Sequence, residues 1–583
     1  MKVGLEIHQQ LDTHKLFCPC PSLIRNDEPH GRVVRNLRAI AGELGDVDIA
    51  AQYEQMKGRD IVYEFYEDTN CLVELDEEPP HPLNEEALKI GLQVALLLNM
   101  EPVEEVHVMR KTVIDGSNPS GFQRTALIAR NGYINTSKGK VRISSLCLEE
   151  DAARKIREEE KRVVYRVDRL GIPLLEIRTE PDIKDPEHAK ETAKLIGMVL
   201  RVCKVKRGIG TIRQDVNVSI PGGNRVEIKG AQDLRHLHLL VEKERKRQEH
   251  VLKLSKELRK RGIKRVRGEV KKVSVKLFGR ETFGVRLEGF KGLIGGGEFR
   301  IGKDFSAIAK NLGYQGIVHC DELPNYGLGK EEVKRIREEL NCEDKDGFVL
   351  IAADEGGARK VLKEIVRRAN QYIKGVPRDV RKANPDGTTS YLRPMPGEAR
   401  MYPETDLEPV VISKEFLEEV RENLPEHPEK TLRRYEKWGI HRGVGEKLIL
   451  SGKFERFEKL VEKYEVRPTI IADLLLSLER HLKKFGLELR EEWLERALKA
   501  IEEGKITKNL VPEFIYAISK GKEEEFLKEF SRDLGEVIEE VLKENQELVS
   551  QERIEKLVGL VLRKVRANPK VVYEIIKGRI KRS

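Results

Sequence analysis

The sequence predicts a multidomain α+β protein, and three features of its 583 residues lead to this prediction. Short segments with alternating polar and apolar residues, typical of strands in a mixed or antiparallel sheet, recur through residues 1–265. A second group of strand-like runs, interspersed with helix-forming stretches, follows in residues 266–385. From about residue 413 the pattern is that of short helices joined by turns that contain Pro and Gly, as in a helical bundle.

The composition indicates an ion-pair-rich surface and a basic C-terminus. Charged residues make up 36% of the chain and aromatic residues only 5%, as in thermophilic proteins. The net charge of +9 is mild for this length, so its distribution matters more than its size. Residues 551–583 hold ten Lys and Arg against three Glu, a net charge of +7. This excess indicates either a phosphate-bearing partner or a solvated helix face.

The cysteines and the absence of long apolar runs point to a cytoplasmic protein. The seven cysteines are odd in number and widely scattered, which argues against a disulfide framework. No signal-peptide pattern opens the sequence, and no apolar run has membrane-spanning length. We therefore expect no membrane association.

Residues 1–11 are predicted to form a strand with a chemically active face. Glu6 and His8 alternate with Leu5 and Ile7, so both polar side chains share one side. Such a pair suits a metal or a phosphate, although a histidine in a strand is often only a structural hydrogen-bonding residue.

Two carboxylate clusters lie in residues 148–182. In PLLEIRTEPD the alternation places Glu176 on the polar side of a strand, where a buried carboxylate needs a cation to meet it. The two clusters could close on a divalent metal. On these residues alone, a solvated helix start and an ordinary strand end are the favoured interpretation. The clusters consist of Glu149, Glu150 and Asp151, and of Glu176, Glu180 and Asp182.

Two later strands carry residues suited to a nucleotide. Alternation puts Arg213, Asp215 and Asn217 on one side of a strand, and RVEIKG places Glu227 and Lys229 likewise on the next. These residues suit a nucleotide phosphate with its metal, and a surface hairpin with a ladder of ion pairs is the alternative. No GxxxxGK[ST] motif occurs, so this is not a P-loop ATPase.

Helices are predicted between these strands from their capping residues. Residues 84–99 begin at an Asn cap, and a second helix begins at Asp185-Pro186. A long basic helix covers about 234–261. The segment 109–124 contains Gly, Pro and Asn and is predicted to be a loop. Arg110 and Lys111, near its start, could face phosphate oxygens, and an exposed turn is the alternative.

Taken together, the motifs resemble a known family. VGLEIHQQLDTHKLFCPCPS, LEEDA, PLLEIRTEPD, TIRQDVNVSI and RVEIKG occur in the order found in the amidotransferase subunits that convert glutamyl-tRNA(Gln) to glutaminyl-tRNA(Gln), the GatB/GatE family. The stretch GLIGGGEFRIGKDFSAIAKNLGYQGIVHCDELPNYG resembles the insertion domain of bacterial aspartyl-tRNA synthetases. The archaeal GatE proteins carry that insertion and the bacterial GatB proteins lack it, so the resemblance favours the GatE branch.

The resemblance implies a domain order and a reaction. The expected domains are a catalytic cradle domain (1–265 and 386–412), an aspartyl-tRNA-synthetase-like insertion (266–385), a helical domain (413–508) and a basic helical tail that binds tRNA (509–583). ATP would phosphorylate the side chain of Glu-tRNA(Gln), and ammonia would displace the phosphate. This is a carbon–nitrogen ligase with glutamine or asparagine as amido donor.

The resemblance also implies site residues, each carried over from a matching motif. The metal, Mg²⁺ or Mn²⁺, would be held by His8, Glu150 and Glu176, with Glu6 as a further catalytic residue beside them or at a second metal. The residues expected to bind ATP or substrate are Lys111, Arg213, Asp215, Asn217, Lys229, Tyr402 and Glu404, with Asn118, Gln123 and Asp406 as further candidates.

A partner and two alternatives complete the interpretation. The sequence shows no amidase Ser-Ser-Lys arrangement and no glutaminase-type cysteine, so ammonia should come from elsewhere. The resemblance implies that its source is an asparaginase-like amidase, GatD, in a heterotetramer with this chain. A structural zinc is not expected, because Cys18 and Cys20 lack CxxC spacing and only Cys71 lies nearby. The alternatives are an ATP-dependent carboxylate–amine ligase for a small substrate and a non-catalytic tRNA-binding scaffold.

Overall fold

The computed structural model divides the chain into two compact units, Met1–Pro425 and Glu426–Ser583. It describes residues 1–39, 45, 47, 49–56, 58–113, 115–159, 162–297, 299–395, 401–529, 534–551, 553–565 and 569–580. The α+β class, with a large sheet followed by a helical C-terminal region, is confirmed. Within the described residues, no helix combines the length and the apolar character that crossing a membrane requires.

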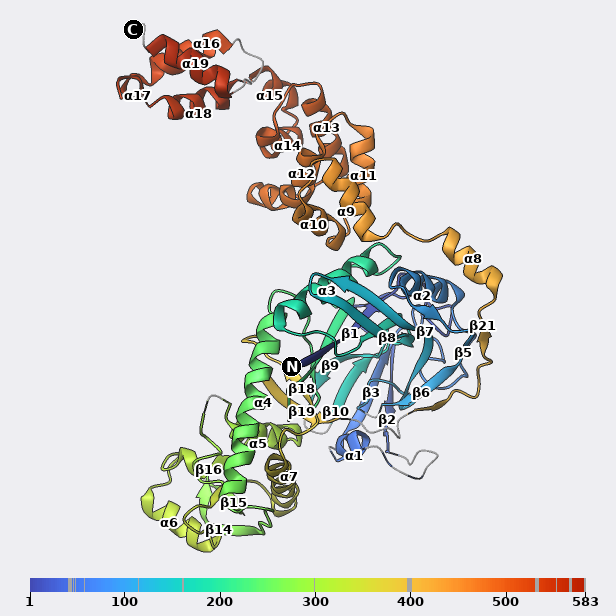
Figure 1. The fold of residues 1–583 in the computed structure, drawn as a ribbon, viewed down its shortest axis with the longest axis vertical. Helices are drawn as coiled ribbons and strands as arrows, with labels where there is room; N and C mark the ends of the chain where they lie inside the picture. The colour runs from blue at the N-terminus through green and yellow to red at the C-terminus, as the bar shows by residue number, and fades with distance from the viewer. Residues whose placement is uncertain are drawn as a thin grey trace. The chain divides into compact units, whose positions relative to one another are not determined.

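An eleven-stranded sheet is the centre of the first unit (Figure 1). Its neighbours are antiparallel except β13 and β18, which are parallel. The strand order is β19 (Thr389–Pro394), β18 (Asp379–Ala383), β13 (Val226–Lys229), β12 (Ile212–Ser219), β1 (Lys2–Gln10), β11 (Pro173–Thr179), β8 (Gly139–Glu150), β7 (Phe122–Thr136), β6 (Val108–Thr112) and β20 (Met401–Pro403), and β4 (Glu101–Pro102) pairs with β7.

Three helices cover one face of this sheet. They are α2 (Glu85–Leu97), α3 (Pro186–Arg201) and α4 (Leu237–Lys260), and they contact β7 and β8, β1 and β7, and β12, respectively. Asn84 and Asp185 cap the first two helices with their side chains, as the sequence predicted. The odd-numbered residues Val3, Leu5 and Ile7 of β1 are buried in the core. Because side chains alternate along a strand, the even-numbered residues of β1 face the other way.

A smaller sheet lies beside the main sheet. It consists of β2 (Gly31–Arg35), β3 (Asp60–Phe65), β10 (Arg162–Arg166) and β9 (Arg154–Glu158), and the helix α1 (Ile49–Gln55) lies between β2 and β3 in the chain. A two-stranded pair, β5 (Glu105–Val106) with β21 (Val410–Val411), precedes the helix α8 (Lys414–Glu422).

The insertion between α4 and β18 has a sheet of its own. Its strands are β14 (Val270–Leu277), β15 (Arg280–Leu287), β17 (Gly347–Ala352) and β16 (Val318–His319), and its helices are α5 (Ile301–Asn311), α6 (Lys330–Glu339) and α7 (Glu355–Lys374), with the short turn η1 (Cys320–Glu322). This stretch therefore contains both strands and helices.

A buried ion network ties the insertion to the main sheet. Asp304 on α5 accepts hydrogen bonds of 2.9 Å from Arg368 on α7 and from Arg381 on β18. Arg368 also donates to Asp379 of β18 at 2.7 Å. All four side chains are almost fully buried, so each charge depends on its partners.

The second unit is entirely helical in its described residues and contains two apolar clusters. The first cluster includes Tyr435, Phe457, Leu475 and Phe514, and the second includes Val537 and Val561. Its helices are α9 (Pro428–Lys437), α10 (Arg442–Leu450), α11 (Phe454–Lys463), α12 (Pro468–Leu482), α13 (Glu491–Glu502), α14 (Val511–Ser519), α15 (Glu523–Glu529), α16 (Leu534–Glu544), α17 (Gln546–Ser550), α18 (Ile554–Lys564) and α19 (Pro569–Ile580), with the turns η2 (Lys483–Phe485) and η3 (Lys508–Leu510).

Packing shifts two of the predicted domain boundaries. The helix α8 was expected in the helical domain, but Lys89 of α2 bonds Glu419 of α8 at 2.7 Å and places it in the first unit. The tail was expected to begin at residue 509, yet Val511, Phe514 and Ile515 of α14 belong to the first helical cluster. Sequence periodicity shows that a helix has an apolar side, but it does not show which part of the protein that side packs against.

Candidate active site

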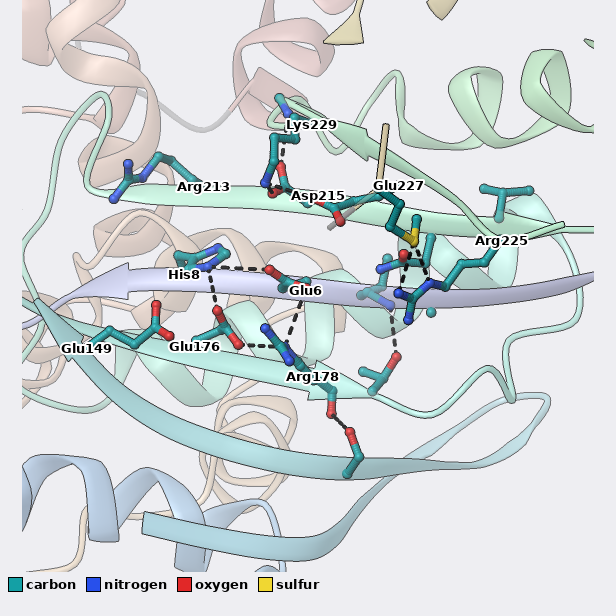
Figure 2. Close-up of a pocket in the computed structure, with 18 of the residues that line it drawn as sticks. Glu6, His8, Glu149, Glu176, Arg178, Arg213, Asp215, Arg225, Glu227 and Lys229 are labelled. Carbon is teal, nitrogen blue, oxygen red and sulfur yellow. Dashed lines mark hydrogen bonds and ion pairs between the residues drawn. The ribbon is translucent and has the colours of Figure 1, made fainter. Parts of the chain in front are cut away.

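Three neighbouring strands place charged side chains in rows on one face of the main sheet. His8 of β1 lies opposite Glu176 of β11 and Arg213 of β12. In the next row, Glu6 lies opposite Arg178 and Asp215. These rows line a cavity of about 840 Å³, shown in Figure 2.

The centre of the cavity is a group of carboxylates around an imidazole. His8 Nε2 lies 3.1 Å from Glu176 Oε2 and 3.7 Å from Glu6 Oε1. Lys111 Nζ lies 2.7 Å from Glu149 Oε1 and 3.7 Å from Glu176 Oε2. Glu149 and Glu176 are 1% and 2% exposed, so the group concentrates negative charge in a place that water barely reaches.

The surroundings shift the pKa values of these groups in different directions. Burial by itself would raise the pKa of Glu176, but Lys111 and His8 hold it well below its usual value. Burial would lower the pKa of His8, yet its hydrogen bond to Glu176 raises it. Burial and the charge of Glu176 raise the pKa of Glu6 to about 7. Glu176 is thus held in its charged form more firmly than Glu6.

Hydrogen bonds from the neighbouring strand β7 fix Glu149. Thr125 Oγ1 donates to Glu149 Oε1 at 2.7 Å, and Gln123 Nε2 donates to Glu149 Oε2 at 3.2 Å. Asp151, just beyond β8, accepts a 2.6 Å hydrogen bond from Gln10 and pairs with Arg213. The side chains of this centre are therefore positioned before any ligand arrives.

The expected nucleotide-binding residues also reach the cavity. Lys229 Nζ lies 2.8 Å from both Asp215 Oδ2 and Glu227 Oε1. Burial opposes its charge, but Asp215 and Glu227 raise the pKa of Lys229. Asn217, Arg225 and Arg393 line the same cavity, as do Lys111, Gln123 and Arg213. The cavity thus combines a carboxylate centre with several cations that could meet phosphate oxygens.

The donor set fits a hard divalent cation. One ligand atom from each of His8, Glu149 and Glu176 lies within 4.8 Å of the others, and Glu6, His8 and Asp215 form a second such group. One imidazole with carboxylates suits Mg²⁺ or Mn²⁺ better than a thiol-preferring metal.

The expected ligand Glu150 does not belong to this group. It follows Glu149 in β8, and alternation turns it to the opposite side of the strand, where it accepts a 2.8 Å hydrogen bond from the backbone N–H of Arg124. Burial raises its pKa. Glu150 lines a separate small cavity together with Asn118, so the structure places Glu149 where Glu150 was expected.

Tyr402 and Glu404 do not line the large cavity either. Tyr402 lies in β20 and Glu404 directly follows it, and β20 pairs with β6 at the end of the sheet. Glu404 is held by Arg110 at 2.6 Å and Arg124 at 2.8 Å, and Tyr402 packs edge-to-face on Phe122. Asp406 is exposed. The ARMYPETD motif, of which residues 399 and 400 lie outside the described residues, therefore braces the strand that carries Lys111.

Arg178 is the main residue that the sequence prediction missed. Its Nε lies 2.5 Å from Glu176 Oε1 and 3.5 Å from Glu6 Oε2. The signal was present, because Arg178 follows Glu176 at strand spacing and so faces the same side. Asp182, from the second carboxylate cluster, does not line the cavity and pairs with Arg142 at 2.8 Å.

A second group of potential metal ligands lies apart from this cavity. Cys18, Cys20, Cys71 and Glu74 each offer a ligand atom within 4.8 Å of the others. The Cys18 thiol donates to Glu74 at 2.9 Å, and hydrogen bonds from Cys18 and Cys71 lower the pKa of Cys20 to about 4. The argument against zinc counted only cysteines, and the structure supplies Glu74 as a fourth potential donor, the number of ligands that a structural zinc takes.

Comparisons with known proteins identify relatives over the whole chain. The model of the GatB/GatE catalytic domain matches residues 1–418, and that of the GatB domain matches residues 455–580. The GatE subunit of glutamyl-tRNA(Gln) amidotransferase from Methanocaldococcus jannaschii is 46% identical over 100% of this chain and 98% of its own length. The proteins of the same name from Pyrococcus furiosus and Thermococcus sibiricus are 45% and 43% identical, over 96% and 100% of this chain and 91% and 98% of their own lengths.

Proposed function

This chain belongs to the GatB/GatE family, and we propose that it is the tRNA-dependent amidotransferase subunit that converts Glu-tRNA(Gln) to Gln-tRNA(Gln). The observation that carries the proposal is the single cavity in which His8, Glu149 and Glu176 lie beside Lys111 and Arg178. A carboxylate centre suited to Mg²⁺, flanked by cations, is what phosphoryl transfer from ATP requires.

The reaction has two steps. The terminal phosphoryl group of ATP passes to an oxygen of the glutamyl side chain, and ADP leaves. Ammonia then attacks the activated carbonyl carbon and loses a proton. Phosphate departs and takes with it the glutamyl oxygen to which the phosphoryl group was attached. In phosphoryl transfer, a protein contributes mainly by positioning the reactants and neutralising charge.

The residues of the cavity divide this work. His8, Glu149 and Glu176 would hold the divalent cation, which supplies charge neutralisation for the phosphoryl group when bound. Lys111 and Arg178, whose counter-ions are these same carboxylates, can turn towards phosphate oxygens. Lys229, Arg213 and Asn217 would hold the nucleotide, and Asp215 orients Lys229 through their 2.8 Å contact. Glu6 lies between the two groups and completes a second potential cation site.

The other parts of the chain serve the macromolecular substrate and the nitrogen source. We assign tRNA binding to the helical unit, whose last 33 residues carry a net charge of +7. The insertion, residues 266–385 by sequence, corresponds to the module found in bacterial aspartyl-tRNA synthetases. Ammonia would come from an asparaginase-like amidase, GatD, in a heterotetramer with this chain.

The test uses this chain with ATP, Mg²⁺ and ammonium chloride. We expect ADP and Gln-tRNA from Glu-tRNA(Gln), and neither product from Glu-tRNA(Glu). A ligase for small substrates would consume ATP without tRNA, and a scaffold would bind tRNA without turnover. Either result, obtained in the presence of the amidase partner, would contradict the proposal.

A further inference from the structure

The tip of the β14–β15 hairpin has an unusual residue at its turn. Leu277 pairs with Arg280, so the turn consists of Phe278 and Gly279 alone, with φ of 53° and 74°. Two successive left-handed residues define the type I′ turn, which favours Asn-Gly or Asp-Gly. A bulky Phe is strained at the first of these positions. Turn formation therefore does not explain why Phe278 is there.

Core packing does not explain Phe278 either. Its side chain is 68% exposed, while its neighbour Leu277 is buried. A second exposed aromatic residue meets it, because Tyr326 lies with its ring centroid 6.4 Å from that of Phe278, at an angle of 70°. Tyr326 is 45% exposed and also has a left-handed backbone, with φ of 53°. Two separate segments thus hold large rings at the surface in conformations that such residues rarely adopt.

The hairpin and its neighbours are held firmly beneath these rings. Leu277 and Leu328, which lie close to Phe278 and Tyr326 in the chain, are buried in one apolar cluster together with Ile336 and Phe348. The rings therefore project from a packed module and lose little freedom when they bind a planar partner.

Basic side chains flank the rings. Lys276 and Arg280 flank the turn and are exposed, and Lys330 begins α6 on the Tyr326 side. None of the three forms an ion pair among the residues that the structure describes, whereas Lys272 pairs with Glu281. Two acidic residues also lie here: Glu322 Oε2 is 3.4 Å from the Tyr326 hydroxyl, and Glu281, which follows Arg280 in the chain, is paired with Lys272 and feels the charge of Lys276. Exposed aromatic rings with flanking cations match the chemistry of unpaired nucleotides, whose bases stack and whose phosphates attract Lys and Arg.

We propose that Phe278 and Tyr326 form a stacking platform for an unpaired nucleobase of RNA, with Lys276, Arg280 and Lys330 on the flanking phosphates. The inference rests on the proposed function in one respect, since the RNA would be the tRNA substrate. It gives the insertion a direct role in binding that substrate.

The sharpest test replaces each aromatic residue with Asn, which tolerates left-handed backbone better than any bulky side chain. The doubly substituted chain (Phe278→Asn, Tyr326→Asn) should melt at the same temperature as the unchanged chain or higher. Its Kd for tRNA(Gln) should rise roughly 5- to 100-fold, the effect expected from lost base stacking. The KM for ATP and the kcat at saturating Glu-tRNA(Gln) should not change. Val34→Asn, at another exposed apolar residue of the first unit, is the matched control and should leave Kd unchanged.

A second pair of variants tests the phosphate contacts. Lys276→Ala with Arg280→Ala should make the dependence of log Kd on log salt shallower by up to about 1.4 units, because each lost phosphate contact on a single strand removes about 0.7. An unchanged Kd in the stable Asn variant, with the unchanged chain active on Glu-tRNA(Gln), would overturn the inference and leave the proposed function standing. If the Asn variant lost binding of the amidase partner and kept binding of tRNA, the inference would also be overturned, because the rings would then contact a protein. If the unchanged chain bound no tRNA, both proposals would fall together.

Discussion

Glu149 and Glu150 are consecutive residues that face opposite sides of β8. Glu149 lines the large cavity and accepts hydrogen bonds from the side chains of Lys111 and Thr125. Glu150 accepts a hydrogen bond from the backbone N–H of Arg124 on the other side of the strand. Strand alternation imposes this division, so only one of the two can join His8 and Glu176.

Substitution of each residue by Gln should therefore have different effects. We expect Glu149→Gln to lower kcat for Gln-tRNA formation at least about 100-fold, because it removes a charge from the cation site. Glu150→Gln should keep kcat within about threefold and should not lower the melting temperature, since burial disfavours the charge of Glu150 and a Gln carbonyl oxygen can still accept the backbone N–H of Arg124. Steady-state kinetics with free ammonia and a melting curve for each variant make the comparison. Equal losses of kcat would return Glu150 to the site.

Glu176→Gln tests the centre of the cavity. This carboxylate contacts His8, Lys111 and Arg178, so its neutralisation should abolish Gln-tRNA formation from free ammonia. Binding of tRNA, measured by filter retention, should remain nearly unchanged because the substituted side chain is buried. Near-normal turnover in this variant would remove the cation site from the mechanism.

The buried carboxylate of Asp304 should make stability depend on pH. Burial alone would raise its pKa, but Arg381 and Arg368 hold that pKa far below the unfolded value of about 3.9. The stabilisation is therefore complete above about pH 5 and is lost as the pH falls towards the folded-state pKa. Asp304→Asn should cost about 3–5 kcal/mol at pH 7 and weaken the fall in urea midpoint as the medium is acidified. Asp344→Asn, at an exposed carboxylate, is the control, and equal behaviour of the two variants would contradict the prediction.

The cysteine group can be tested by metal content. We expect the purified chain to hold about one equivalent of zinc, because three thiols and Glu74 make a four-ligand set. Cys71→Ser should lose the metal and melt at a lower temperature, while Cys342→Ser, far from the group in sequence and absent from it, should keep both. Mass spectrometry of the metal gives the answer. A zinc-free chain whose melting temperature is unaffected by added zinc would contradict this expectation.

The basic tail can be removed without opening the preceding cluster. Deletion of residues 530–583 spares α14 and α15, whereas a cut at 509 would remove Val511 and Phe514 from the first helical cluster. The shortened chain should bind tRNA more weakly and with a shallower salt dependence, because phosphate contacts are lost. Titrations at several salt concentrations measure the slope. An unchanged slope would mean that the tail does not contact phosphate.

The alternation of side chains along single strands could be predicted from the sequence, whereas the pairing of distant strands could not. Glu6 with His8, and Arg213 with Asp215 and Asn217, were expected on shared faces and do line one cavity. Their catalytic roles remain predictions. Alternation also predicts that Glu149 and Glu150 face opposite sides of β8. It does not say which of the two faces the cavity unless the register of β8 against β11 is known. That register depends on strand pairing, which the sequence does not state.

The partners of Tyr402 and Glu404 could not be predicted for a related reason. The strand that carries Tyr402 and ends just before Glu404 pairs with β6, from a segment almost 300 positions earlier in the chain, and Arg110 and Arg124 then neutralise Glu404. Likewise, Glu74 became a candidate ligand only once the fold had brought it to Cys18. Pairings between distant segments are set by the packed fold and leave no periodic signal.

The row arrangement of the cavity also limits how this protein can change during evolution. Each row takes one residue from each of several strands, so exchanging a side chain alters one position and leaves the rest intact. Gain or loss of a single residue within β1 would instead turn Glu6 and His8 into the apolar layer and bring Leu5 and Ile7 to the cavity. In a library of random variants, this strand should therefore accept many exchanges and almost no insertions or deletions. Length would be the more strictly inherited property of β1, ahead of the identity of most of its residues.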